Sequence, residues 1–146
     1  MKKDSAGYAA VQPAWDTQDC SVRALAVATG VNYETASATF SARGRRLGKA
    51  TEAELSRRLY EDVLGMRRIT LAEGLRLEAF LRVASSGSFI VHTKRHAFAV
   101  VEGVVCDWEG TRTSHGGTKL EQVWKVTDLA KGKMRKMESV MKELGA

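Results

Sequence analysis

One cysteine near the start of the chain has the surroundings of a nucleophile. Cys20 follows the polar run 16–19 and opens an Ala-, Val- and Leu-rich segment that ends at Gly30. Acceptor side chains and acidic groups before an apolar run are typical of a helix start. The partial positive charge and the backbone amides at a helix start favour a thiolate over a thiol. Cys20 is therefore a candidate nucleophile, although most free cysteines are small buried hydrophobes.

A later histidine and aspartate could supply the base that such a thiol needs. Segments 97–101 and 104–108 are rich in β-branched and aromatic residues, and Glu102-Gly103 between them has the composition of a two-residue hairpin turn. Because strand side chains alternate between faces, this register makes His96 and Asp107 diagonal neighbours on one face, within hydrogen-bonding reach. A three-residue turn would instead put Asp107 on the opposite face.

The same register assigns the other residues of the hairpin to its two faces. Phe98 pairs with Asp107 and His96 pairs with Glu109 on the first face. The opposite face is expected to be apolar and comprises Ala97, Ala99, Val101, Val104, Cys106 and Trp108. Cys106 should therefore be a core residue and Trp108 a packing residue.

Three such groups together could perform nucleophilic catalysis. Asp107 would hold the tautomer of His96, and His96 together with the helix dipole would keep the Cys20 sulfur ionised. Backbone amides beside the sulfur would stabilise an oxyanion. The chain order Cys, His, Asp, with the thiol on a first helix and the other two groups on a later sheet, is the papain-like arrangement.

The rest of the chain must bring these groups together. We expect an extended arm over 1–14, helices over 19–29, 32–42, 51–64 and 70–84, strands over 66–70, 88–92, 97–101, 104–108 and 122–126, and a C-terminal helix over 128–146. Asn32 should cap the second helix, and Thr51 and Thr70 each begin a capping box. The segment 43–49 reads as a mobile basic loop. The predicted class is α+β, with N-terminal helices packed on an antiparallel sheet.

The C-terminal helix is expected to be amphipathic and to dock on the core. Its apolar residues near one face are Leu129, Met137, Met141 and Leu144, with lysines on the other face.

Composition describes an ordinary soluble globular protein. The 146 residues, 44% hydrophobic and 27% charged, suit one domain spanning 1–146. No apolar run approaches the ~20 residues that span a bilayer, and the first residues lack an apolar signal core, so we expect a cytoplasmic protein. Two cysteines are too few for a disulfide framework, and no CxxC pair indicates zinc. We expect neither a metal nor a cofactor.

The net charge of +6 raises the question of an acidic partner. The basic residues are dispersed in clusters at 43–49, 57–58, 67–68 and 131–136, and no nucleic-acid-binding motif accompanies them. A solvated basic surface explains them best. An acidic protein or a nucleic acid bound through the basic loops remains the alternative.

The chain also resembles a known family. The run 18–26, followed by 30–33, is similar to the nucleophile helix of small papain-like proteins found in tailed phages and bacteria. The runs 87–91 and 96–107 resemble the histidine hairpin of those proteins, so the resemblance spans about 15–108. It implies a papain-like fold in which Cys20 is the nucleophile, His96 the base and Asp107 the orienting acid. If a phage encodes the protein, the host cytoplasm is its expected location.

The sequence departs from that family before the nucleophile. Papain-like peptidases usually carry an oxyanion glutamine six residues before the cysteine, where this chain has Ala14. Gln18 is the nearest candidate, with Gln12 further away, and Trp15 could line the cleft. Among the other histidines, His92 and His115 are expected on the surface. His115 lies in a glycine-rich segment and could contact a substrate.

Three functions fit these observations. The first is a papain-like thiol hydrolase that cleaves a peptide or isopeptide bond in a protein or peptide substrate through an acyl-enzyme on Cys20. The second is acyl transfer or glutamine deamidation at the same site. The third is a non-catalytic binding protein on the same fold that engages an acidic protein or a nucleic acid.

Overall fold

The computed structural model describes residues 1–4, 18–46, 49–107 and 114–145. Trp15, Trp108 and Glu109 lie outside these ranges, as does most of the expected N-terminal arm. Residues 2–4 run alongside β4 (Val104–Cys106), where the Val105 amide donates to the Lys2 carbonyl and the Asp4 amide donates to the Val105 carbonyl. The start of the chain therefore covers one edge of the sheet.

Helices and an antiparallel sheet make up the described chain. The helices are α2 (Cys20–Thr29), α3 (Tyr33–Ser41), α4 (Ala53–Arg57), the π-helix η1 (Arg58–Val63), α5 (Leu77–Val83) and α6 (Asp128–Glu143). The remaining strands are β1 (Arg67–Ile69), β2 (Ser88–Thr93), β3 (His96–Val101) and β5 (Gln122–Lys125). The five strands pair antiparallel in the order β1-β5-β2-β3-β4. The predicted α+β class and the C-terminal helix are confirmed.

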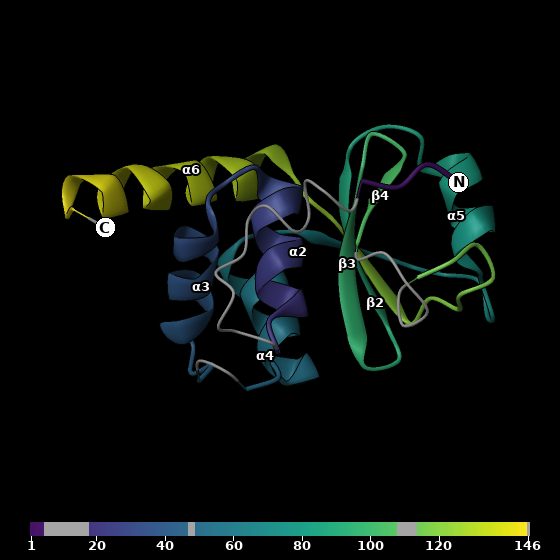
Figure 1. Ribbon diagram of the computed structural model, residues 1–146, viewed down its shortest axis with the longest axis horizontal. Helices are drawn as coiled ribbons and strands as arrows, with labels where there is room; N and C mark the ends of the chain where they lie inside the picture. The colour runs from purple at the N-terminus through teal and green to yellow at the C-terminus, as the bar shows by residue number, and fades with distance from the viewer. Residues whose placement is uncertain (5–17, 47–48, 108–113, 146) are drawn as a thin grey trace.

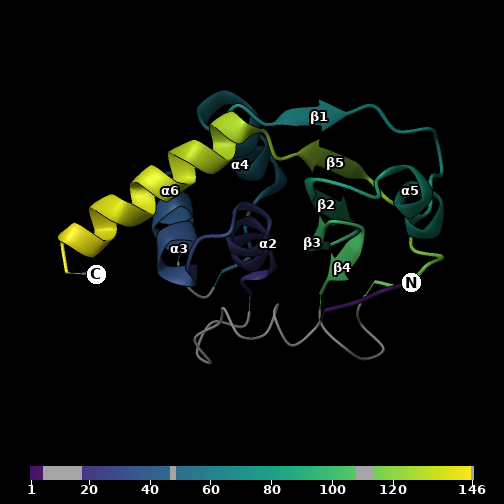
Figure 2. The same cartoon turned by 90° about the horizontal axis from the view of Figure 1, so that it is seen from above.

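Both faces of the sheet are covered. Helices α2 and α3 lie on one side of the strands and α5 lies on the other (Figures 1 and 2). Ala97, Ala99 and Cys106 pack in the cluster that includes α2. The other hairpin face is apolar too, because Phe98 and Val105 are buried in the cluster that includes α5. The face predicted to be apolar is therefore buried, and the opposite face of the hairpin is buried as well.

The β3–β4 hairpin has the predicted register. Glu102 (φ 50°) and Gly103 (φ 76°) form the two-residue turn, both in the left-handed region, as a turn matched to strand twist requires. The observed pairs are Val101 with Val104, Val100 with Val105 and Ala99 with Cys106. Asp107 follows directly after β4, so the turn determines where its side chain lies.

The first two helices have the predicted ends. Gly30 ends α2 with a φ of 75°, and its amide donates to the Ala26 carbonyl. Asn32 caps α3, its side chain accepting a hydrogen bond of 2.9 Å from the Thr35 amide. These local signals were sufficient because each depends on neighbours along the chain.

Neither predicted capping box forms. Glu52, not Thr51, precedes α4, and no side chain caps that helix. The helix expected over 70–84 is only α5, because the segment before it pairs with 118–120: the Leu77 amide donates to the Thr118 carbonyl and the Leu120 amide to the Leu75 carbonyl. Tertiary hydrogen bonds thus replace the first turns of the predicted helix.

Two further expectations need correction. Within the basic loop, Arg45 is buried and its Nη2 donates to the Gln18 carbonyl at 3.0 Å. In α6 the buried residues are Ala130 and Met134, whereas Leu129 and Met137 are exposed. The predicted apolar face of α6 was therefore wrong by part of a turn. No helix in the described ranges has the length and apolarity needed to cross a membrane.

Candidate active site

Cys20 lies at the amino end of α2. The helix begins there because Asp19 precedes it in a non-helical conformation (φ −112°, ψ 19°) and accepts the first helical hydrogen bond, from the Arg23 amide, through its carbonyl. The Asp19 side chain does not cap the helix. It pairs instead with the buried Arg23 side chain at 2.8 Å. This ion pair anchors the helix start within the core.

His96 and Asp107 form the predicted hydrogen bond. His96 Nε2 lies 2.8 Å from Asp107 Oδ1, and the Asp107 side chain is fully buried. Asp107 Oδ2 accepts two more hydrogen bonds, from Ser114 Oγ at 2.7 Å and from the Ser114 amide at 3.1 Å. Burial raises the pKa of Asp107, but the hydrogen bonds and charge of His96 and the hydrogen bonds of Ser114 outweigh it and hold the pKa below its usual value. Asp107 is therefore a carboxylate that orients the ring.

Cys20 is the second partner of the His96 ring. Burial lowers the pKa of His96, but hydrogen bonds and charge interactions with Asp107 and Cys20 outweigh it and raise the pKa to about 9. Because Nε2 faces Asp107, Nδ1 is the ring nitrogen left for the thiol. Phe98 stacks on the ring at 5.9 Å and 29° and limits its movement. The imidazole is thus positively charged at neutral pH and held between a thiol and a carboxylate.

A cavity of about 470 Å³ opens onto this pair. Its lining includes Cys20, His96 and the exposed residue Gln18, together with Ser21, Ala50, Thr51, Ala53, His92, Thr93, Arg95, Ala97, Glu121 and Gln122. The structure therefore brings together the three predicted site residues and one of the two secondary candidates, Gln18. Trp15, the other secondary candidate, lies outside the described residues.

His92 was wrongly expected on the surface. Its ring packs against Tyr60 and Trp124, with centroids 5.9 and 4.7 Å away, and its Nε2 atom is buried. Burial, together with the charge of His96, lowers the pKa of His92 to about 4. The prediction failed because both faces of the preceding part of β2 are buried, so alternation gave no signal.

Ser114, His115 and Cys106 lie at three different kinds of position. Ser114 was missed: it lies in a loop, and no local pattern relates it to Asp107. His115 is exposed, its Nδ1 accepts from the Gly117 amide, and it is not among the described residues that line the cavity. Cys106 is buried, as predicted, and burial raises its pKa to about 11.

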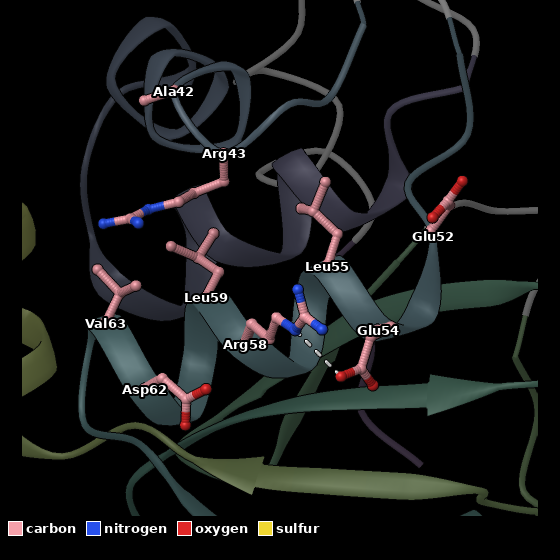
Figure 3. A pocket seen from close by; sticks show the side chains of 9 residues that line it. All are labelled: Ala42, Arg43, Glu52, Glu54, Leu55, Arg58, Leu59, Asp62 and Val63. Atoms are coloured by element: carbon pink, nitrogen blue, oxygen red, sulfur yellow. Dashed lines mark hydrogen bonds and ion pairs between the residues drawn. The ribbon is translucent and has the colours of Figure 1, made fainter.

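A larger cavity lies elsewhere and has different chemistry. It encloses about 590 Å³ between the end of α3 and the helix formed by α4 and η1 (Figure 3). Leu55, Leu59 and Val63 form its apolar part, and the Arg58 guanidinium binds Glu54 at its rim (Figure 3). No thiol, hydroxyl or imidazole is among the described residues that line it. The nucleophilic chemistry therefore belongs to the smaller cavity.

The described part of the chain holds no candidate metal site, and the chain has no matching relative. Among the described residues, no group of three or more His, Cys, Asp or Glu side chains could hold a metal ion. No protein-family model, curated protein or solved structure matches this chain. Functional interpretation therefore depends on the geometry of the site.

Proposed function

We propose that the protein is a papain-like thiol hydrolase that cleaves a peptide or isopeptide bond. The observation that carries this proposal is the position of His96 between the Cys20 thiol at a helix start and the buried Asp107 carboxylate, 2.8 Å from the ring. A nucleophile, a base and an orienting acid in this relation suit acyl transfer to sulfur.

Each residue has one task in the proposed reaction. The Cys20 thiolate attacks the carbonyl carbon, and the sulfur–carbon bond forms as the carbonyl π electrons move to oxygen. His96 gives its proton to the departing amine as the carbon–nitrogen bond breaks. A water molecule, deprotonated by His96, then attacks the acyl carbon. The carbon–oxygen bond forms, the carbon–sulfur bond breaks, and the acid leaves while Cys20 returns to the thiolate. Asp107 keeps the ring oriented throughout.

Two further observations support the papain-like interpretation. The nucleophile helix α2 packs against the sheet that carries His96, and Asp107 directly follows the adjacent strand β4. The resemblance over 15–108 relates the same segments to papain-like proteins of phages and bacteria. A free thiol nucleophile also suits a reducing compartment, and we place the protein in the cytoplasm on that ground.

Selective labelling of the two cysteines tests the proposal. We expect iodoacetamide at neutral pH to modify Cys20 much faster than Cys106, because Cys20 lines a cavity whereas Cys106 is buried with a pKa near 11. We also expect p-nitrophenyl acetate to leave an acetyl group on Cys20. Peptide mapping by mass spectrometry locates both adducts.

Matched variants complete this test. Cys20→Ala should abolish acylation, whereas Cys106→Ala should leave the labelling of Cys20 intact, and circular dichroism checks that both fold. Equal, slow labelling of the two cysteines in the unaltered protein would contradict the proposal. Addition of a primary amine as acceptor would distinguish acyl transfer from hydrolysis by the product formed.

One surface favours a second candidate function, the binding of an acidic partner. Arg43, Arg46 and Lys49 are exposed and line a cavity of about 340 Å³. That cavity shares Ala50 and Thr51 with the one around Cys20. Binding of such a partner would weaken as the salt concentration rises, because salt screens the attraction between exposed charges. Binding of an acidic peptide by Cys20→Ala, lost on replacement of the three basic residues by Glu, would support this function.

A further inference from the structure

Two residues that line the cavity around Cys20 each carry a buried polar atom without a hydrogen-bond partner among the described residues. His92 Nε2 and Thr51 Oγ1 have no hydrogen-bond partner among the described residues, and both residues line the cavity that contains Cys20. Buried side-chain polar atoms are nearly always hydrogen-bonded, so such an atom in a cavity wall indicates a missing partner. The cavity has space for that partner, in the form of part of a substrate.

The His92 ring is held in a defined orientation. Its β2 position pairs with Gln122 of β5 and with Ala97 of β3, so it lies inside the sheet rather than at an edge. Tyr60 and Trp124 contact the ring in edge-to-face geometry, at interplanar angles of 77° and 71°. Trp124 is fixed in turn, because its Nε1 donates to Glu61 at 2.8 Å. A donor on this ring would be preorganised.

The charge state of His92 suits a neutral donor. Its pKa of about 4 leaves the ring uncharged at neutral pH, owing to its burial and to the nearby charge of His96. A neutral imidazole donates from one nitrogen and accepts at the other. His92 is a poor general base under these conditions, and His96 already occupies that role beside Asp107. Donation to a developing negative charge is the remaining chemistry.

We propose that His92 Nε2–H and the backbone N–H of Cys20 form the oxyanion hole of this site. The inference rests on the proposed function and adds a catalytic residue to it. The first amides of a helix lack intrahelical acceptors, so the Cys20 amide has no acceptor within α2. When the thiolate attacks, the sulfur–carbon bond forms and the carbonyl π pair moves to oxygen. The two N–H groups then bind that oxygen until it re-forms the carbonyl and expels the leaving group.

Two reagents separate oxyanion stabilisation from thiol reactivity. Acylation by p-nitrophenyl acetate passes through a tetrahedral oxyanion, whereas alkylation by iodoacetamide displaces iodide without one. We expect His92→Phe to slow acylation of Cys20 by about a hundredfold and to leave the alkylation rate unchanged. His92→Gln, which restores an N–H donor, should recover part of the acylation rate. His115→Phe, a change of an exposed histidine outside the cavity, is the matched control and should react like the unaltered protein.

The possible outcomes distinguish this inference from the proposed function. Equal acylation rates for His92→Phe and the unaltered protein would overturn the oxyanion role while leaving the hydrolase intact. Equal loss of acylation and alkylation would also overturn it, because His92 would then act on the thiol or on the fold. If His92→Phe fails to fold, the same comparison is made with His92→Gln and His92→Leu. Cys20 inert to both reagents in the unaltered protein would overturn both proposals.

Discussion

His92 and His96 have the same side chain but differ in charge at neutral pH: His92 is neutral and His96 is positively charged. His92 packs against Tyr60 and Trp124, and its burial and the charge of His96 lower its pKa to about 4. His96 is also largely buried, yet Asp107 and Cys20 raise its pKa to about 9. The deciding factor is the partner, because burial acts against the charged form in both rings. One ring is thus suited to donate neutrally and the other to carry a proton.

We therefore expect the two rings to titrate far apart. In an NMR titration the His96 ring should have its midpoint near pH 9 and the His92 ring near pH 4. Asp107→Asn should shift the His96 midpoint downward, because the carboxylate that stabilises its charged form is removed. Ser114→Ala, which removes one hydrogen bond from Asp107, should shift it less. A His96 midpoint unchanged by Asp107→Asn would contradict the assigned orienting acid.

The same pKa shifts make stability depend on pH. Because the folded-state pKa of His96 is raised above ~6.5, its stabilising contribution is complete below that pH and is lost as the pH rises through about 9. His92 has the opposite sign: its lowered pKa gives stability above about pH 6.5 that is lost as the pH falls toward 4. We expect His96→Gln to lose less free energy of unfolding at alkaline pH than the unaltered protein, and His92→Gln to lose less at acidic pH. Urea unfolding across a range of pH measures both.

At the scale of the elements, the β3–β4 turn determines whether the site is assembled. Glu102 and Gly103 both have positive φ, and the short turn brings Asp107 back beside His96. A shift of one residue would send the carboxylate to the opposite face. The turn is further fixed to the neighbouring chain, since the Glu102 amide donates to the Gly87 carbonyl at 2.9 Å. The register is therefore a functional feature of this hairpin.

Substitution of two glycines should have effects of opposite sign. Gly103→Ala places a Cβ at φ 76° and 3.4 Å from the Ser85 carbonyl oxygen, so we expect a loss of about 1–2 kcal/mol in the free energy of unfolding. The alkylation rate of Cys20 should fall as well. Gly132→Ala is the control, because this exposed helical position in α6 has open space and should gain up to about 1 kcal/mol. Denaturant unfolding measures both, and equal effects would contradict the role of the turn.

Across the whole molecule, α6 ties together elements that are distant in sequence. Glu138 accepts a hydrogen bond of 2.6 Å from the Asn32 amide at the start of α3. Thr127 Oγ1 donates to the Gly65 carbonyl, just after η1, at 3.0 Å. Lys133 Nζ donates to the Val63 carbonyl, at the end of η1, at 2.8 Å. Figure 1 shows the far end of α6 extending beyond these helices. The buried side chains of α6, Ala130 and Met134, both lie in its first half.

Two methionines on α6 test this division. Met134 is 1% exposed and contacts Thr39, whereas Met137 is 41% exposed. We expect Met134→Ala to lower the free energy of unfolding by about 2–4 kcal/mol, because it leaves a cavity in the core. Met137→Ala should change it by no more than about 0.5 kcal/mol. Similar losses for the two variants, measured by urea unfolding, would show that the outer part of α6 packs as tightly as its first half.

The sequence by itself determined the features that depend on short-range geometry. The start of α2 at Cys20, the cap at Asn32 and the register that joins His96 to Asp107 follow from turn and helix-end chemistry. Each of these depends on residues that are close along the chain or joined by one tight turn. The predicted α+β class follows from the same local patterns.

Only the tertiary structure decided the features that depend on distant segments. His92 became part of the cavity because helices cover both faces of its sheet, and the start of the predicted helix over 70–84 was lost to hydrogen bonds with 118–120. Ser114 reached Asp107 through a loop that carries no periodic pattern. The contact between Cys20 and His96 has the same origin, because local propensity cannot specify which distant surfaces meet when the chain buries its apolar area.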